Sequence, residues 1–237
     1  MATYVLGDLH GHIEIYKKVK SLLKPEDKVI FVGDACDRGP ESWECVKAIY
    51  NDPQFIYLKG NHEDMFVRAA EDYIKHGDWI YETAALCYRN GGKDTLNSWL
   101  KDPDKIDWLN KIKKLPVIFT YTNEDCTFVI THAGYTPWGD SELPCDYDLM
   151  WDREHYFDIW LNGDMMNVII VHGHTPNEYL AEDLYLEWNF KNAVWYADGH
   201  KVCVDTGGFY TGSWTLLNLD TYEEIFIELD GNDQMCF

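Results

Sequence analysis

Acidic, imidazole and amide side chains recur in this chain directly after short apolar runs. Their oxygen and nitrogen atoms are suitable ligands for divalent metals such as Mn, Fe and Zn. Two such ions, held about 3.5–4 Å apart by a bridging carboxylate, could clamp an in-line displacement at phosphorus. The clusters that could supply this chemistry are Asp8-Leu-His10, Asp34-Ala-Cys-Asp37-Arg38, Asn61-His62, His132 and His172-Gly-His174.

Each cluster alone has an ordinary structural explanation. Asp-x-His occurs by chance in many proteins, and a single histidine after a strand is more often a hydrogen-bonded structural residue. Buried carboxylates and imidazoles without partners, however, would cost several kcal/mol each. The recurrence of such clusters at the same place after successive apolar runs therefore favours one shared site.

The apolar runs themselves have the length and composition of strands buried on both faces. Helical patterns lie between the first three runs, and strand–helix alternation of this kind predicts a parallel sheet with crossover connections. In open α/β sheets, ligands bind beyond the carboxyl ends of the strands, where each of these runs carries its polar cluster. The runs are Tyr4–Asp8, Val29–Asp34, Phe55–Asn61, Thr127–His132 and Val168–His174.

Two further segments complete the expected organisation. Residues 63 to about 115 are mostly helical in pattern, which predicts a helical insertion that could form one wall of the site. Beyond His200 the pattern alternates again, and we expect Trp214–Leu219 and Ile225–Leu229 to be closing strands of a second sheet. Since no repeat or low-complexity linker divides the 237 residues, we expect a single domain over 1–237.

The composition narrows the classes of partner. A formal net charge of −21 disfavours sequence-independent binding to nucleic acid and docking on an anionic membrane. The first residues read as a strand and lack the regions of a signal peptide, and no apolar run approaches the roughly 18 residues of a spanning helix. We therefore expect a cytoplasmic protein with no nucleic-acid or membrane partner. Its oligomeric state is left open.

The motifs together resemble a known family. Gly7–Gly11, Gly33–Gly39 and Gly60–Glu63 are similar to the signature of calcineurin-like metallophosphoesterases. With His132-Ala-Gly134 and Gly173-His-Thr175, they resemble the phosphoprotein phosphatase branch. Trp151–Glu154 and Val204–Gly207 are similar to further motifs of its compact bacterial and bacteriophage lambda-type members. The resemblance implies an α/β fold of four layers, α/β/β/α, in which two mixed sheets pack face to face between flanking helices.

The same resemblance implies roles for individual residues. His62 would protonate the leaving group, oriented by Asp37, and Arg38 and Arg153 would grip the phosphoryl oxygens together with Asn61. A metal-bound water or hydroxide would be the nucleophile. The two ions would be divalent, with Mn²⁺ expected first and Fe or Zn as alternatives. The implied metal ligands are Asp8, His10, Asp34, Asn61, His132 and His174.

Three functions remain open on these grounds. The first is a serine/threonine protein phosphatase, with dual specificity an option, that acts on a phosphoprotein or a small phosphate ester. The second is a dinucleoside polyphosphate hydrolase acting on a substrate such as diadenosine tetraphosphate, because Arg38–Ser42 and His132–Pro137 also resemble that branch. That branch typically has a small apolar residue in place of Asp37, which favours the phosphatase. The third is a metal-binding scaffold without catalysis.

Overall fold

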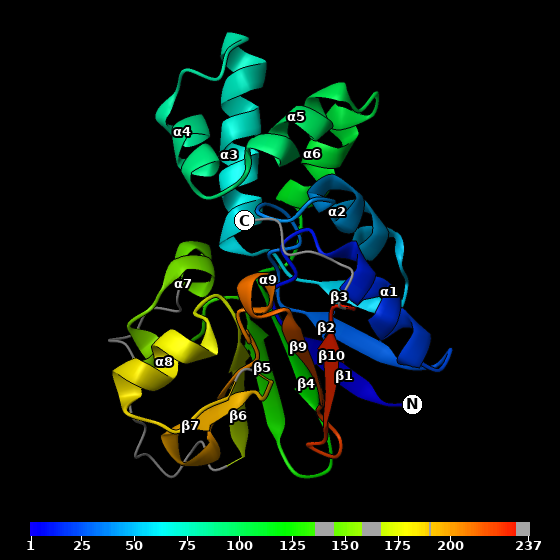
Figure 1. Ribbon diagram of the computed structural model, residues 1–237, viewed down its shortest axis with the longest axis vertical. Coiled ribbons are helices and arrows are strands. Elements are labelled where there is room, and N and C mark those ends of the chain that lie inside the picture. Colours follow the sequence, from blue (N-terminus) through cyan, green and yellow to red (C-terminus); the bar gives the residue numbers. More distant parts are fainter. Residues whose placement is uncertain (136–144, 158–166, 190, 231–237) are drawn as a thin grey trace.

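Two five-stranded sheets lie face to face in the computed structural model, with helices on their outer faces (Figure 1). The structure describes residues 1–135, 145–157, 167–189 and 191–230. Both sheets are mixed, since each combines parallel and antiparallel pairs. The α/β class and the four layers expected from the sequence are confirmed.

The first sheet has the order β10-β9-β1-β2-β3. Its three parallel strands, β1 to β3, come from the first part of the chain, whereas β9 and β10 add to it as antiparallel strands. The bounds are β1 Thr3–Leu6, β2 Lys28–Phe31, β3 Phe55–Tyr57, β9 Ser213–Asn218 and β10 Glu224–Glu228.

The second sheet has the order β4-β5-β6-β8-β7 and also contains three neighbouring parallel strands, β5, β6 and β8. The outer strands β4 and β7 pair antiparallel to β5 and β8. The bounds are β4 Ile118–Thr122, β5 Thr127–Thr131, β6 Val168–His172, β7 Val194–Tyr196 and β8 Lys201–Cys203.

The expectation that the last strands close the second sheet is wrong for β9 and β10. Strand β9 pairs with β1, with Tyr4 opposite Asn218 and Leu6 opposite Leu216, so both strands extend the first sheet. The alternation of apolar and polar residues gives a strand its period but does not identify its partner.

Successive residues of the central strands point to opposite faces of the sheet, so they enter different apolar layers. Val5 and Ile30 point into the layer between the two sheets, while their neighbours Leu6 and Phe31 pack against the helices outside the first sheet. A third apolar layer lies outside the second sheet, where Leu180 of α8 meets the strand residues. These central strands are therefore buried on both faces, as their apolar runs predicted.

The helices divide into those that cover the sheets and those that stand apart from them. Figure 1 shows α3 to α6 as a separate group above the sheets, drawn in cyan and green. Within the described residues, no helix is both long enough and apolar enough to cross a membrane. The bounds are α1 Ile13–Leu22, α2 Ser42–Asn51, α3 Asn61–His76, α4 Glu82–Arg89, α5 Lys93–Lys101, α6 Lys105–Lys113, α7 Asp146–Trp151, α8 Asn177–Leu184 and α9 Gly208–Thr211.

The apolar layer between the sheets should contribute strongly to the stability of the fold. Ile30 lies in it with 0% exposure, whereas Ile80 is 76% exposed. We expect Ile30→Ala to lower the free energy of unfolding by about 2–5 kcal/mol, because it removes buried apolar contacts and leaves a cavity. The same change at Ile80 should stay within about 0.5 kcal/mol. Denaturant unfolding measures both, and equal losses would contradict this assignment of the core.

Candidate metal centre

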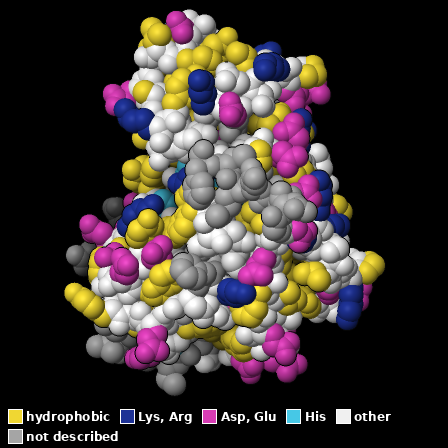
Figure 2. Space-filling view, viewed as in Figure 1, with side chains coloured by type: hydrophobic (Ala, Val, Ile, Leu, Met, Phe, Trp, Pro, Cys, Tyr) yellow, Lys and Arg dark blue, Asp and Glu magenta, His cyan; other side chains and the backbone are white. Residues whose placement is uncertain are grey.

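Every predicted metal ligand lies just beyond the carboxyl end of a parallel strand. Asp8 and His10 follow β1, and Asp34 follows β2. Asn61 opens α3 after β3, while His132 follows β5 and His174 follows β6. Because the two sheets pack face to face, these loops meet at one edge of the molecule. In the space-filling view, histidine contributes only a small area, between the upper helices and the sheets (Figure 2).

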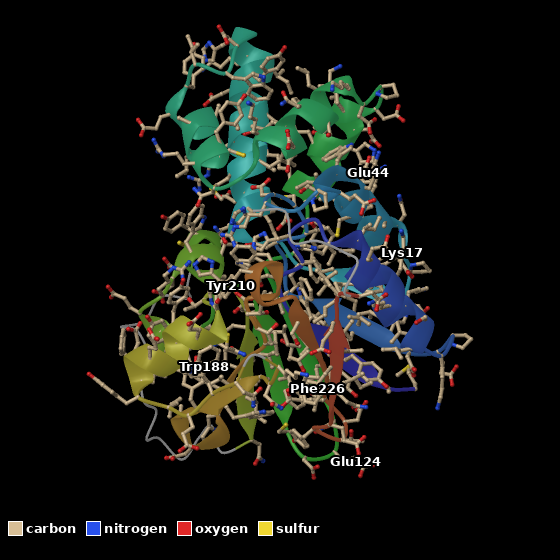
Figure 3. The ribbon with its side chains drawn as sticks, viewed as in Figure 1. Lys17, Glu44, Glu124, Trp188, Tyr210 and Phe226 are labelled. Atoms are coloured by element: carbon tan, nitrogen blue, oxygen red, sulfur yellow. The ribbon has the colours of Figure 1, made fainter. Side chains whose placement is uncertain are left out.

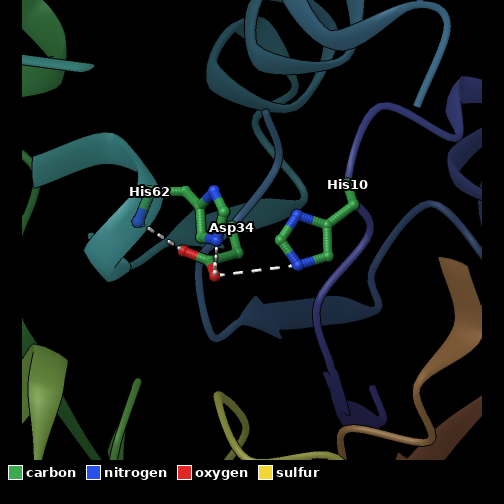
Figure 4. A group of neighbouring side chains, drawn as sticks. All are labelled: His10, Asp34 and His62. Atoms are coloured by element: carbon green, nitrogen blue, oxygen red, sulfur yellow. Dashed lines mark hydrogen bonds and ion pairs between the residues drawn. The ribbon is translucent and has the colours of Figure 1, made fainter. Parts of the chain in front are cut away.

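The carboxylate of Asp34 is the centre of this group (Figure 4). Its Oδ2 lies 3.4 Å from His132 Nε2, 3.8 Å from His62 Nε2 and 3.9 Å from His10 Nε2. Two sets of three residues each bring their ligand atoms within 4.8 Å of one another: His10, Asp34 and His62, and Asp8, Asp34 and His132. Asp34 belongs to both sets, so its carboxylate lies where two ions could share it.

Atoms that could bind a metal ion converge beside Asp34. His132 Nδ1 lies 3.0 Å from the carbonyl of Val32, which can only accept, so Nδ1 carries a proton. His132 Nε2 lies 2.9 Å from Asn61 Oδ1 and 3.4 Å from Asp34 Oδ2, and a protonated ring can donate to these acceptors. His174 Nδ1 lies 2.9 Å from the same amide oxygen. Among the described residues, none offers a hydrogen bond to the buried Nε2 of His174.

Burial and crowding perturb the acidic groups of the site. Burial, then the nearby Asp205, raises the pKa of Asp8 well above its ordinary value, and burial raises the pKa of Asp205 to about 6. Burial would raise the pKa of Asp34 too, but His132 and His62 outweigh it and hold that pKa well below the ordinary range. Burial lowers the pKa of His132, yet Asp34 and Asp8 raise it to about 9.

Positive charge at the centre of the cluster would stabilise the ionised forms of these crowded carboxylates. Divalent cations would supply that charge to the crowded carboxylates and a partner to the buried Nε2 of His174 at once. Carboxylate, imidazole and amide oxygen together suit Mn, Fe or Zn better than Ca, which prefers oxygen ligands alone. The residues present therefore fit a metal centre.

His10 is held in the tautomer that a metal ligand needs. Its Nδ1 lies 3.0 Å from the carbonyl oxygen of Cys36, to which it donates. Burial, then the guanidinium of Arg38, holds the pKa of His10 well below its ordinary value. The ring is therefore neutral, and the lone pair of Nε2 faces Asp34 and Arg38.

His62 and Asp37 form a buried pair at the rim of the cluster. His62 Nδ1 lies 2.7 Å from Asp37 Oδ2, and Asp37 Oδ1 accepts a hydrogen bond of 2.6 Å from Thr95 Oγ1. The carboxylate therefore fixes the proton on Nδ1 and turns Nε2 toward Asp34. This is the geometry of a positioned proton donor and the partner that orients it.

The two predicted arginines occupy different positions. Arg38 reaches the cluster directly, with its guanidinium 2.8 Å from His10 Nε2 and 3.2 Å from His62 Nε2. Arg153 lies against the loop of His174, where it donates 2.9 Å to Thr175 Oγ1. Both side chains are exposed, so both can meet a ligand that enters from solvent.

The loops adopt backbone conformations that most residues avoid. Left-handed φ values occur at His10 (44°), Asp34 (58°), Asp37 (69°), Arg38 (67°) and His174 (65°). Residues other than glycine hold such values only where surrounding contacts enforce them, and they gather at functional sites. Five residues of the site loops therefore carry local backbone strain.

Glu63 holds the conformation of these loops. The sequence alone assigned it no role. Its fully buried carboxylate accepts hydrogen bonds of 2.8 to 2.9 Å from the backbone N–H groups of Asp34, Ala35 and Gly60. It therefore ties the loop after β2 to the loop after β3. Gly60 allows the close approach, since a Cβ there would lie 2.0 Å from Asp34 Oδ1.

Two other contributors were also missed. Asp205 follows β8 just as the other acidic residues follow their strands, so the same rule would have found it. Thr95 lies 58 positions from Asp37, and no local pattern connects them. Pro137, part of one motif considered above, lies outside the described residues.

The sequence is similar to curated proteins of two kinds. A serine/threonine-protein phosphatase 2 of Escherichia coli is 33% identical over 141 residues, which are 56% of this chain and 58% of that protein. A symmetrical bis(5'-nucleosyl)-tetraphosphatase of Proteus mirabilis is 30% identical over 147 residues, which are 59% of this chain and 47% of that protein. The chain thus spans about half the length of these curated relatives.

A crystal structure of a metallophosphoesterase from Sphaerobacter thermophilus has the same fold, with a TM-score of 0.57. It is 15% identical in sequence, and the superposition covers 97% of this chain and 88% of that one. The model of the calcineurin-like phosphoesterase family matches residues 1–204, which include every strand that leads to a candidate ligand. The chain belongs to the calcineurin-like phosphoesterase family.

Proposed function

We propose that this protein hydrolyses phosphate monoesters with the help of two divalent cations, and that phosphorylated serine or threonine in a protein is its main substrate. Family membership supports the phosphoesterase chemistry. The observation that carries the choice of substrate is the pair formed by His62 and Asp37, 2.7 Å apart beside the metal cluster. The similarity to a bacterial serine/threonine-protein phosphatase points the same way.

Two ions would share Asp34. Asp8 and His10 would hold the first ion with Asp34, and Asn61, His132 and His174 would hold the second with the same carboxylate. Mn²⁺ is proposed first, with Fe and Zn as alternatives. When bound, the ions supply positive charge to the phosphoryl oxygens and a more acidic water at neutral pH.

His62 acts as the proton donor to the leaving oxygen. The alkoxide of serine or threonine is a poor leaving group, so its departure needs a proton in the transition state. Asp37 accepts the Nδ1 hydrogen bond and stabilises the imidazolium, whose Nε2 proton is directed at the site and can pass to the leaving oxygen. A dedicated acid of this kind is most useful for an alkyl phosphate monoester.

The arginines bind the phosphoryl group. Arg38 presents its planar guanidinium at the cluster, and Arg153 approaches from the loop of His174. Two N–H donors in one plane match two phosphoryl oxygens better than a lysine ammonium does. The amide of Asn61 supplies a further polar contact.

The alternative is hydrolysis of a dinucleoside polyphosphate such as diadenosine tetraphosphate. The similarity to symmetrical tetraphosphatases favours it. Cleavage of a phosphoanhydride, however, expels a phosphate that needs little protonation, so the acid pair would contribute less there. A scaffold without catalysis is the third option.

A comparison of substrates tests the proposal. A phosphoserine peptide, diadenosine tetraphosphate and p-nitrophenyl phosphate are offered to the protein with Mn²⁺ and, separately, with EDTA. The expected result is Mn²⁺-dependent turnover, with a higher kcat/KM for the peptide than for the dinucleotide. A higher kcat/KM for the dinucleotide would favour the dinucleoside polyphosphate hydrolase. No turnover of any substrate would favour a metal-binding scaffold without catalysis.

Metal binding should be visible without any substrate. Mn²⁺ at about 100 times its Kd should stabilise the folded protein by about 2.7 kcal/mol per site, because the ligands converge only in the folded state. Thermal unfolding measures this as a rise in Tm that EDTA reverses. Asp34→Asn should remove most of the rise, whereas Asp107→Asn, at an exposed residue of α6, should keep it. An equal rise in both variants would contradict the bridging role of Asp34.

The acid role of His62 predicts a dependence on the leaving group. His62→Asn should slow an alkyl phosphate such as phosphoserine by about 100-fold or more, the usual contribution of a general acid. It should slow p-nitrophenyl phosphate much less, because p-nitrophenolate leaves readily without a proton. His76→Asn, at an exposed histidine, is the matched control. Equal slowing of both substrates would remove His62 from this role.

A further inference from the structure

The guanidinium of Arg38 contacts three rings, and one of them belongs to Phe209, far away in the sequence. Its guanidinium carbon lies 4.3 Å from the ring centroid of Phe209. Two guanidinium nitrogens meet His10 Nε2 and His62 Nε2 at 2.8 and 3.2 Å. The histidines therefore hold the N–H edge of the guanidinium, and the phenyl ring contacts it through a cation–π interaction.

Phe209 is itself placed by the segment that carries it. Helix α9 is a single turn at the junction of the sheets and the upper helices. It carries both Phe209 and Tyr210, and Tyr210 is labelled in Figure 3. A Cβ on Gly208 would lie 2.0 Å from the indole of Trp214, so the turn packs directly on that ring. The buried Trp214 donates from Nε1 to the carbonyl of Asp8 at 2.8 Å. The turn is thereby tied to the loop of a proposed metal ligand.

Phe209 is not explained as part of the hydrophobic core. It is half-buried and belongs to none of the apolar clusters of the described residues. Its described ring contacts are His10, with centroids 5.3 Å apart, Tyr210 and the guanidinium of Arg38. A phenyl ring whose main partners are two polar groups of a site is placed to orient them.

We propose that Phe209 is a positioning residue, which holds the guanidinium of Arg38 over its ring at the site, where it can bind phosphoryl oxygens when metal ions occupy the cluster. This inference rests on the proposed function. Arg38 is exposed and has a flexible stem, so the ring restricts the orientations that its planar fork can take. Since the site is partly open to solvent, the loss of this contact should weaken phosphate binding roughly two- to fivefold.

A double-mutant cycle tests the proposal with inorganic phosphate as the probe. Its affinity for the Mn²⁺-loaded protein is measured by calorimetry in the wild type, Phe209→Leu, Arg38→Ala and the double variant. We expect Phe209→Leu to weaken phosphate binding roughly two- to fivefold, and to have no further effect once Arg38 is alanine. Phe209→Tyr should restore wild-type affinity because it retains an aromatic face.

Two controls separate positioning from a general structural effect. Phe226→Leu makes the same change at a 47% exposed residue of β10 and should leave phosphate affinity unchanged. The Mn²⁺ affinity and the Tm of Phe209→Leu should stay close to wild type. If the leucine variant does not fold, Phe209→Met repeats the cycle with apolar volume but without a π face.

Three outcomes would overturn the inference: unchanged phosphate affinity in Phe209→Leu, an equal loss in the Arg38→Ala background, or a failure of Phe209→Tyr to restore binding. The proposed function fails separately. A wild-type protein that binds phosphate with this coupling but hydrolyses no ester would refute the function and leave the positioning role standing. A wild-type protein that binds no phosphate would refute both.

Discussion

A carboxylate buried among imidazoles is the interaction on which the rest of this structure depends. Asp34 is 1% exposed, and three histidine nitrogens lie within 3.9 Å of its Oδ2. An ionised group in such a place is tolerated only if positive charge or hydrogen bonds compensate for the lost water. His10 and His62 follow strands of the first sheet, and His132 follows a strand of the second. The face-to-face packing of the sheets and the electrostatics of the site therefore support each other.

The loops accept unfavourable backbone conformations because rigid neighbours enforce them. Three backbone N–H groups donate to Glu63, and the backbone N–H groups of Leu9 and His10 both donate to the carbonyl of Asp34. These bonds link the loops after the first three strands into one unit. A site built in this way is preorganised, so little ordering remains to be done when an ion or a phosphate arrives.

Much of the fold and of the site's membership could be predicted from sequence, because both follow from local patterns. Apolar runs that end in polar residues identify parallel strands and the edge at which their ends meet, which brings Asp8, Asp34 and His132 together. Partnerships over long distances in the chain could not be predicted. The pairing of β9 with β1, the bond from Thr95 to Asp37 and the contact of Phe209 with Arg38 arise only from packing in three dimensions.

The pairing of β1 with β9 has a consequence for how the chain folds. Residues 3–6 and 213–218 are almost the full length of the sequence apart, so closing this contact carries a large loop entropy. During synthesis, one edge of β1 remains without its hydrogen-bonding partner until residues 213–218 have emerged. An open strand edge of this kind can pair with other chains. The nascent protein is therefore open to aggregation along this edge of β1 until β9 is made.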